Sequence, residues 1–304
     1  MKIILTGATG FIGSSLVKRL AGRHELVVFS RNVPKARQFF GGGTGIQFAD
    51  WHQPPSHLAA LIDGSQALIN LAGEGIGQSR WTPSRKEALL WSRVQTAGML
   101  YSLLKASEIR LDTVIQASAI GFYGNNQTET FDEESPAGSG FLAEITKKWE
   151  EAAAPLADVS RRLVVARSGL VLASHGGILP KIARPFRFFL GGKIGNGNQW
   201  MSWIDLEDEL EAILFLLRNP QCHGVYNLTS PYPAQQSDFA VSLAKSLKRP
   251  SFFQIPAPAI RFAMGEMGNE LLLKGARVMP KRLTEAGYRF QYPNLDEALI
   301  AIYD

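Results

Sequence analysis

The sequence predicts an α/β fold built on a doubly wound parallel sheet, with a smaller C-terminal lobe. A short apolar run at the N-terminus leads into a glycine-rich turn and then into an apolar-periodic segment. Further apolar runs alternate with segments of helical length as far as residue 167, after which glycines and prolines become frequent. Strands that alternate with helices form parallel sheets through right-handed crossovers, and such sheets bind ligands beyond the carboxyl ends of their strands.

The first turn carries the strongest prediction. Residues 2–13 read KIILTGATGFIG, which predicts a strand, a turn with three glycines and the start of a helix. Gly7 can take backbone angles closed to other residues, Gly10 lets a pyrophosphate approach the main chain, and Gly13 lets the helix pack close to the strand. The helix would present its N–H groups and its positive dipole end to phosphates. This turn therefore predicts a Rossmann-type dinucleotide site made by Gly7, Thr9, Gly10, Phe11, Ile12 and Gly13.

The spacing of these glycines is Thr-Gly-x-x-Gly-x-x-Gly rather than Gly-x-Gly-x-x-Gly. In this string the chain resembles the extended short-chain dehydrogenase/reductases, which are mostly nucleotide-sugar epimerases, dehydratases and reductases. The resemblance implies a nicotinamide cofactor and hydride transfer to or from a small-molecule substrate.

The second predicted strand, residues 25–30, bears on the choice of cofactor. About 20 residues past the glycine turn, an NAD enzyme carries Asp or Glu to bind the ribose 2′-hydroxyl. This sequence has Ser30, Arg31 and Asn32 there. An arginine beside a serine hydroxyl can bind a 2′-phosphate through charge-assisted bonds, whereas a carboxylate would repel it. We therefore predict NADP(H) rather than NAD(H), the alternative being that Arg31 is a solvated surface charge.

Residues 45–51 and 67–73 predict the third and fourth strands. The resemblance implies that the acidic residue ending the third strand meets the adenine and that the Asn-x-Ala-Gly ending the fourth lies under the cofactor. Glu74 comes next, either at the cofactor ribose or facing solvent. We therefore expect further cofactor contacts from Asp50, Trp51, Leu71, Ala72, Gly73 and Glu74. A helix over about residues 83–106 and a fifth strand over residues 113–118 follow.

The resemblance implies that the chemistry lies just after the fifth strand. Family members carry a Ser or Thr there to orient the substrate, and Ser118 matches it. They also carry Tyr-x-x-x-Lys on the next helix to supply the proton, with both residues on one helix face. Residues 140–150 contain no such pair, and when Glu150 is aligned with the family's helix, Leu142 and Thr146 stand at the two positions.

Two tyrosines outside residues 140–150 are candidates for the missing acid. Tyr101 and Lys105 have the required spacing, but they precede the fifth strand and we regard the match as chance. Tyr123 is the tyrosine nearest to Ser118 in the sequence. We predict that Tyr123 replaces the missing acid, the alternative being an aromatic side chain that packs against the substrate or the sheet.

A set of strings along the whole chain narrows the resemblance. They include Asn-Leu-Ala-Gly-Glu at 70–74, Arg-Trp-Thr at 80–82, Arg-Ser-Gly-Leu-Val-Leu at 167–172 and Met-Pro-Lys-Arg-Leu at 279–283. The chain thereby resembles the YfcH-like "epimerase family", an atypical branch of the extended short-chain dehydrogenase/reductases named for nucleoside-diphosphate-sugar epimerases. That name rests on the fold, which is a poor guide to the reaction. With this resemblance we assign substrate contacts to Arg80, Trp81, Arg167, Lys193 and Trp203.

The predicted lobes divide at residue 167. The NADP(H)-binding Rossmann domain takes residues 1–167 and about 203–228, and the substrate-binding lobe takes about 168–202 and 229–304. Glycines in the segment 176–197 stand among lysines and arginines, which suits an anionic ligand and equally a mobile surface loop.

Composition limits the other classes of function. The 304 residues carry a formal charge of only +5, with scattered basic residues that give weak support for nucleic-acid binding. No apolar stretch is long enough to span a membrane, and the chain starts in its first strand, so we expect no signal peptide. One cysteine excludes an internal disulfide and favours the cytoplasm. The histidines stand apart, so no metal site is predicted, and no Gly-x-Ser-x-Gly motif supports hydrolysis.

Three interpretations are open at this point. The first is an NADP(H)-dependent epimerase or oxidoreductase acting on a nucleotide sugar or another small, anionic substrate. The second is an NADP(H)-binding redox sensor without turnover, which the missing dyad favours. The third is an interaction protein with a vestigial nucleotide site. The resemblance also implies a homodimer through the long helices before and after the fifth strand.

Overall fold

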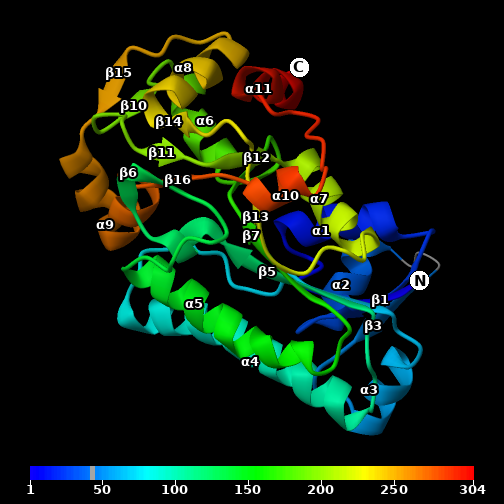
Figure 1. Cartoon of the computed structure of the whole chain (residues 1–304). Helices are drawn as coiled ribbons and strands as arrows, with labels where there is room; N and C mark the ends of the chain where they lie inside the picture. The colour runs from blue at the N-terminus through cyan, green and yellow to red at the C-terminus, as the bar shows by residue number, and fades with distance from the viewer. Residues whose placement is uncertain (42–44) are drawn as a thin grey trace.

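The computed structural model describes residues 1–41 and 45–304, and its centre is a seven-stranded parallel sheet (Figure 1). This confirms the predicted Rossmann-type fold. Strand order reverses between β1 and β4, so the carboxyl ends of these two strands form the crevice where such sheets bind ligands. In spatial order the strands are β13 (Gly224–Leu228), β7 (Leu163–Ser168), β5 (Thr113–Ala119), β4 (Ala67–Asn70), β1 (Lys2–Thr6), β2 (Glu25–Phe29) and β3 (Ile46–Ala49).

Helices cover both faces of this sheet because its strands are apolar on both sides. Ile3 and Leu5 of β1 pack with α1 (Phe11–Leu20) and α7 (Leu206–Arg218) on one face. Ile4, between them in the strand, packs on the other face with α3 (Pro55–Ile62) and α4 (Pro83–Ala106). The helix α5 (Phe141–Ala153) lies beside α4 on that second face (Figure 1). The remaining helix of this half of the chain is α2 (Val33–Phe40).

The chain leaves the central sheet at Gly169, directly after β7. A Cβ atom at Gly169 would lie 2.6 Å from the Ser202 carbonyl oxygen, so only glycine allows this approach. The next strand, β8 (Leu170–Ala173), pairs with β12 (Trp203–Asp205) and β9 (Gly176–Gly177) in a separate sheet. Residues 203–205, which we expected with the Rossmann domain, therefore lie beside β8 and outside the seven-stranded sheet.

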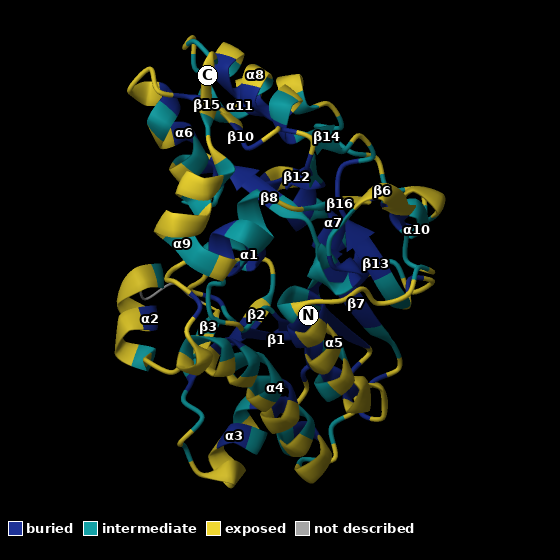
Figure 2. Ribbon diagram, turned by 90° about the vertical axis from the view of Figure 1, so that its left-hand side faces the viewer, coloured by how far each residue is buried: buried dark blue, intermediate teal, exposed yellow. Residues whose placement is uncertain are grey.

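A second core lies outside the central sheet and is built mainly from the helices α6 (Leu179–Arg187), α8 (Gln236–Ser246) and α11 (Leu295–Tyr303). Figure 2 shows buried residues concentrated in the central strands and exposed residues on the outer faces of the helices. Among the described residues, no helix is both long and apolar enough to cross a membrane. The elements that complete the chain are β6 (Asn126–Phe131), α6 (Leu179–Arg187), β10 (Gly192–Ile194), β11 (Trp200–Met201), β14 (Ala234–Gln235), α8 (Gln236–Ser246), β15 (Phe253–Ile255), α9 (Ala257–Leu272), β16 (Ala276–Val278), α10 (Lys281–Glu285) and α11 (Leu295–Tyr303), together with the short 3₁₀ helices η1 (Ile120–Tyr123) and η2 (Ala154–Ala157).

Candidate functional site

The glycine turn between β1 and α1 is closed as tightly as its sequence suggests. Gly7 has φ +69°, and a Cβ atom there would lie 2.9 Å from the backbone nitrogen of Ala72. A Cβ atom on Gly13 would overlap the Gly7 carbonyl oxygen and lie 2.9 Å from the Cα atom of Ala8. The first turn of α1 contains no acidic residue, so its N–H groups and dipole are not neutralised by a carboxylate. This cradle fits the pyrophosphate of a dinucleotide.

A second pair of glycines covers the start of α1. The ring of Phe11 packs directly under β9, where a Cβ atom at Gly177 would lie 2.9 Å from the ring and one at Gly176 would overlap it. His175 meets the same ring edge-on, with 5.9 Å between the ring centroids. The Gly-Gly pair therefore lets the second lobe reach the glycine turn, a contact that sequence reasoning did not foresee.

Arg31 and Asn32 follow β2, and Asp50 and Trp51 follow β3, so these residues lie at the carboxyl edge of the sheet, where the glycine turn also lies. The Arg31 side chain is 80% exposed, and its Nη1 atom is 3.2 Å from Glu74 Oε1. Asn32 accepts a hydrogen bond from the backbone nitrogen of Lys35 at 2.9 Å and so caps α2. Asp50 accepts one from the backbone nitrogen of His52, also at 2.9 Å. Trp51 packs on Phe29 with 4.4 Å between the ring centroids.

Buried amides fix the end of β4. Asn70 accepts a hydrogen bond from the Thr6 hydroxyl at 2.5 Å and donates one to Gln116 Oε1 at 2.7 Å, which ties three neighbouring strands together. The side-chain oxygen of Asn70, Oδ1, also accepts from the backbone nitrogen of Ala72 at 3.2 Å. The Asn-x-Ala-Gly string thus orients the loop that carries Gly73 and Glu74.

Two basic residues of α4 hold that loop. Arg85 Nη1 lies 2.5 Å from Glu74 Oε2, and this bond, followed by the one from Arg31, lowers the pKa of Glu74. Arg93 Nη2 donates to the Glu74 carbonyl oxygen at 3.0 Å, and its guanidinium lies 4.9 Å from the centre of the Trp149 ring. Burial, aided by the charge of Arg85, lowers the pKa of Arg93 to about 10. Sequence reasoning assigned Arg93 no role, although a cation four residues after the buried Leu89 is an unusual feature of a core-facing helix side.

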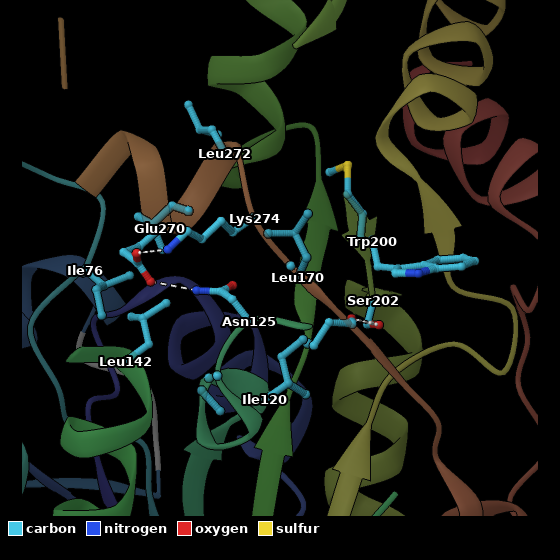
Figure 3. A pocket seen from close by; sticks show the side chains of 18 of the residues that line it. Ile76, Ile120, Asn125, Leu142, Leu170, Trp200, Ser202, Glu270, Leu272 and Lys274 are labelled. Carbon is cyan, nitrogen blue, oxygen red and sulfur yellow. Dashed lines mark hydrogen bonds and ion pairs between the residues drawn. The ribbon is translucent and has the colours of Figure 1, made fainter. Parts of the chain in front are cut away.

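A cavity of about 250 Å³ lies beyond the carboxyl ends of β5 and β7 (Figure 3). Leu142 and Thr146, the residues at the dyad positions, both line it. Gly121 lies against this pair, because a Cβ atom there would be 3.3 Å from Leu142 Cβ and 3.4 Å from Thr146 Oγ1. The two positions that the sequence aligns with the family's Tyr-x-x-x-Lys pair therefore lie in the wall of this cavity. Arg93 also lines the cavity and connects it to the Glu74 loop.

Ser118 and Tyr123 lie in a buried network beside this cavity and are not among its lining residues. The Ser118 hydroxyl donates to Glu150 Oε1 at 2.5 Å, and Arg167 binds both oxygens of Glu150 at 2.7 and 2.8 Å. The Tyr123 hydroxyl, in a residue only 1% exposed, accepts from Arg167 at 2.9 Å and donates to Asn227 at 2.8 Å. Burial raises the pKa of Tyr123. These contacts match the packing alternative for Tyr123.

The structure brings none of the five expected substrate residues to the cavity lining. Arg167 is held by Glu150. Arg80 donates to the backbone carbonyl oxygens of Phe262 and Ala263 in α9. The indole nitrogen of Trp81 donates to the Ile76 carbonyl oxygen at 2.9 Å, and that of the fully buried Trp203 to the Tyr232 carbonyl oxygen at 3.2 Å. The remaining residue is Lys193, in the centre of β10.

Tyr101 and Lys105, which have the spacing of the family's catalytic pair, are bonded to each other on the surface of α4. The Lys105 ammonium donates to the Tyr101 hydroxyl at 2.9 Å on α4, and neither residue lines the cavity. The spacing is therefore a local helix contact.

A buried carboxyl behind the cavity is the polar group that sequence reasoning missed most completely. Ser168 lines the cavity, and its hydroxyl donates to Glu209 Oε1 at 2.5 Å. Glu209 is fully buried on α7, and its Oε2 atom has no hydrogen-bond partner among the described residues. Burial raises the pKa of Glu209 to about 7. An acid on the buried side of α7, between Leu206 and Leu210, is the pattern that could have revealed it.

We expect Glu209 to make the protein less stable as the pH rises. Its pKa of about 7 lies above the ordinary 4.5, so between these values the folded state binds the proton and the unfolded state releases it. This difference costs about 3 kcal/mol of stability as the pH passes from below 4.5 to above 7. Glu209→Gln should flatten the fall in the free energy of unfolding between pH 5 and pH 8, measured by urea titration. The exposed Glu285→Gln is the control, and an unchanged pH dependence in Glu209→Gln would contradict the prediction.

The described residues contain no group of three or more His, Cys, Asp or Glu side chains placed to hold a metal ion. The candidate site has three parts. They are the glycine turn between β1 and α1, the loop at Glu74 that Arg31 and Arg93 contact, and the cavity beyond β5 and β7.

Comparison with known proteins agrees with this architecture. The model of the "NAD dependent epimerase/dehydratase family" matches residues 3–145, and a "Domain of unknown function (DUF1731)" matches residues 255–302. An epimerase family protein of Mycobacterium leprae is 36% identical over 98% of this chain and 94% of its own length. The chloroplastic SDR39U1 homolog of Arabidopsis thaliana is 38% identical over 99% of this chain and 86% of its own length.

A solved structure covers the same length. Human epimerase family protein SDR39U1 (isoform 2), crystallised with NADPH, superposes with a TM-score of 0.88 and 32% identity, over 100% of this chain and 99% of its own. The chain therefore belongs to the epimerase family, the atypical branch of the extended short-chain dehydrogenase/reductases that its sequence strings predicted.

Proposed function

We propose that this protein is an NADP(H)-dependent oxidoreductase or epimerase that acts on a small hydroxyl or carbonyl compound. The observation that carries the proposal is the glycine turn, in which Gly7 packs against the backbone of Leu71 and Ala72 and Gly13 against that of Gly7 and Ala8, so that no other residue fits at either position. The human relative crystallised with NADPH supports the same cofactor.

The cofactor contacts follow from the cradle. Thr9 and Gly10 are exposed at the turn, and the N-terminus of α1 receives the phosphates. Arg31 is assigned to the 2′-phosphate, since its guanidinium is highly exposed and its partner Glu74 is bound more closely by Arg85. A bound nicotinamide would supply hydride transfer. We assign the cofactor to the lobe of residues 1–167 with about 203–228, and we propose that the substrate lies between that lobe and the lobe of about 168–202 with 229–304.

The proton is assigned to Ser168 rather than to Ser118 or Tyr123. The hydroxyls of Ser118 and Tyr123 are bonded inside the Glu150–Arg167 network, whereas Ser168 lines the cavity. Glu209 bonds the Ser168 hydroxyl, and a pKa of about 7 suits a group that exchanges protons near neutral pH. When the Ser168 hydroxyl gives its proton to a substrate oxygen, protonated Glu209 replaces it.

A second candidate function is an NADP(H)-binding redox sensor without turnover. The leucine and threonine at the dyad positions favour it, because neither is an acid strong enough to replace tyrosine activated by lysine. Turnover of any substrate by the protein with NADPH would exclude it.

The proposed setting is the cytoplasm, because the only cysteine, Cys222, is buried and has no partner for an internal disulfide. We also propose a homodimer that uses α4, whose outer face exposes Trp91 and Met99.

Arg31→Ala tests the cofactor assignment. A 2′-phosphate bound by Arg31 should favour NADPH over NADH by about 1.5–3 kcal/mol, or roughly 10- to 150-fold. The variant should lose most of this preference when NADPH and NADH are titrated against protein fluorescence.

Arg23→Ala is the matched control, since Arg23 is an exposed arginine before β2, at the opposite edge of the sheet. An unchanged NADPH preference in Arg31→Ala would remove Arg31 from the cofactor site.

A further inference from the structure

The walls of the cavity beyond β5 and β7 are apolar. Aliphatic and aromatic side chains reach it from the β4–α4 loop, from α5 and from the second lobe (Figure 3). Its volume of about 250 Å³ lies below the range of about 300–1,000 Å³ found at sites for drug-sized molecules. A ligand that fills it is therefore small. The side chains that make this surface include Ile76, Ile120, Leu142, Trp149, Leu170 and Ile182.

Several polar groups of the wall are bonded to the protein. The Ser202 hydroxyl donates to the Ala276 carbonyl oxygen and accepts from the backbone nitrogen of Val278, both at 2.9 Å. The Gln199 amide nitrogen donates to the carbonyl oxygens of Ile194 and Leu272. A sugar ring would bring several hydroxyls to this surface, and most of the wall consists of apolar side chains that cannot replace the water those hydroxyls give up.

The charged groups at the outer end of the cavity also pair with one another. Figure 3 shows Glu270 between Asn125 and Lys274, at 2.6 Å from the Asn125 amide nitrogen and 2.8 Å from the Lys274 ammonium. The other cation in the wall, Arg93, donates to the Leu89 and Glu74 carbonyl oxygens. A diphosphate at this end would have to share the Lys274 ammonium with Glu270 and would lie close to that carboxylate, which repels it.

We propose that the substrate is a compact, largely apolar ketone or alcohol whose single oxygen faces Ser168, and not a nucleoside-diphosphate sugar. The reaction is the one proposed above, and the inference rests on it to that extent. The class of substrate follows from the apolar side chains of the cavity wall. The aliphatic body lies against Leu142, Leu170 and Ile182, and the oxygen exchanges a hydrogen bond with the Ser168 hydroxyl.

Isothermal titration calorimetry with 2-decalone, a bicyclic aliphatic ketone, tests the proposal on the whole protein. We expect 2-decalone to bind and UDP-glucose at the same concentration to give no heat of binding. Leu142→Asn keeps the size of the side chain but adds an amide to the wall, so it should weaken 2-decalone binding at least tenfold. Leu190→Asn makes the same change at a leucine that is 55% exposed, and it should leave binding unchanged.

The outcomes separate the two proposals. Binding of UDP-glucose without 2-decalone, or binding of 2-decalone that is unchanged in Leu142→Asn, overturns the apolar substrate class. A parallel NADPH titration decides the other question: if NADPH binds and 2-decalone does not, the substrate class falls and the cofactor function stands. If 2-decalone binds as expected and NADPH does not, the cofactor function falls and the cavity assignment stands.

Discussion

Glu150→Ala is expected to destabilise the protein by about 3–5 kcal/mol. The Arg167 side chain is almost fully buried and depends on both oxygens of Glu150 for its charge-assisted bonds. Burial by itself lowers the pKa of Arg167, but the bonds to Glu150 outweigh it and raise that pKa overall. Removal of the carboxylate leaves a buried cation without its counter-charge and the Ser118 hydroxyl without its acceptor.

Glu151→Ala provides a matched control one residue along α5. Its carboxylate is 60% exposed and lies 3.9 Å from Lys147, a geometry worth little in water, so we expect a change within about 0.5 kcal/mol. Urea unfolding of the two variants measures the difference in the free energy of unfolding. The double variant Glu150→Leu with Arg167→Leu should recover part of the loss, since it buries no unpaired charge. If Glu150→Ala lowered the free energy of unfolding by less than 1 kcal/mol, the Glu150–Arg167 pair would not be what holds the end of β7 to α5.

The central sheet was predictable because each of its strands is a local pattern. An apolar run bounded by turn residues identifies a buried strand whatever its neighbours, and the helix expected over about residues 83–106 occupies Pro83–Ala106 in the structure. The second lobe was not predictable in the same way. Its strands β9, β11 and β14 have two residues each, too few to show a periodicity, and β11 pairs with β14 more than 30 residues further along the chain.

The catalytic side of the site depended on contacts that a sequence does not contain. Ser118 lies near the end of β5, but its partner Glu150 is 32 residues away, and Arg167 reaches the pair from β7. Side chains alternate across a strand, so a shift of one residue moves a hydroxyl from the cavity to the packed layer behind it. Ala119, next to Ser118, is the residue that lines the cavity. Polar residues on buried helix faces, such as Arg93 and Glu209, would have been better guides than the order of residues in a motif.

Gly13→Ala is expected to have the second large effect, a loss of about 3 kcal/mol or more in the free energy of unfolding. The added methyl group would overlap the Gly7 carbonyl oxygen and press on the Ala8 Cα atom at 2.9 Å. Both neighbours are backbone atoms of the glycine turn, so neither can move aside without opening the junction of β1 and α1. The turn is also the proposed phosphate cradle, and we expect NADPH binding to weaken more than tenfold in the same variant.

Gly98→Ala separates this clash from the ordinary effect of replacing a helical glycine. Gly98 lies within α4, and a Cβ atom there would meet no atom within 4 Å. Alanine is the better helix former, so Gly98→Ala should stabilise the protein by about 0.4–1 kcal/mol and leave NADPH binding unchanged. The two substitutions are chemically identical, and only the approach of α1 to the turn distinguishes them. If Gly13→Ala proved as stable as Gly98→Ala, the helix would not need to approach the turn so closely, and the cradle would lose the geometry on which the proposed cofactor site depends.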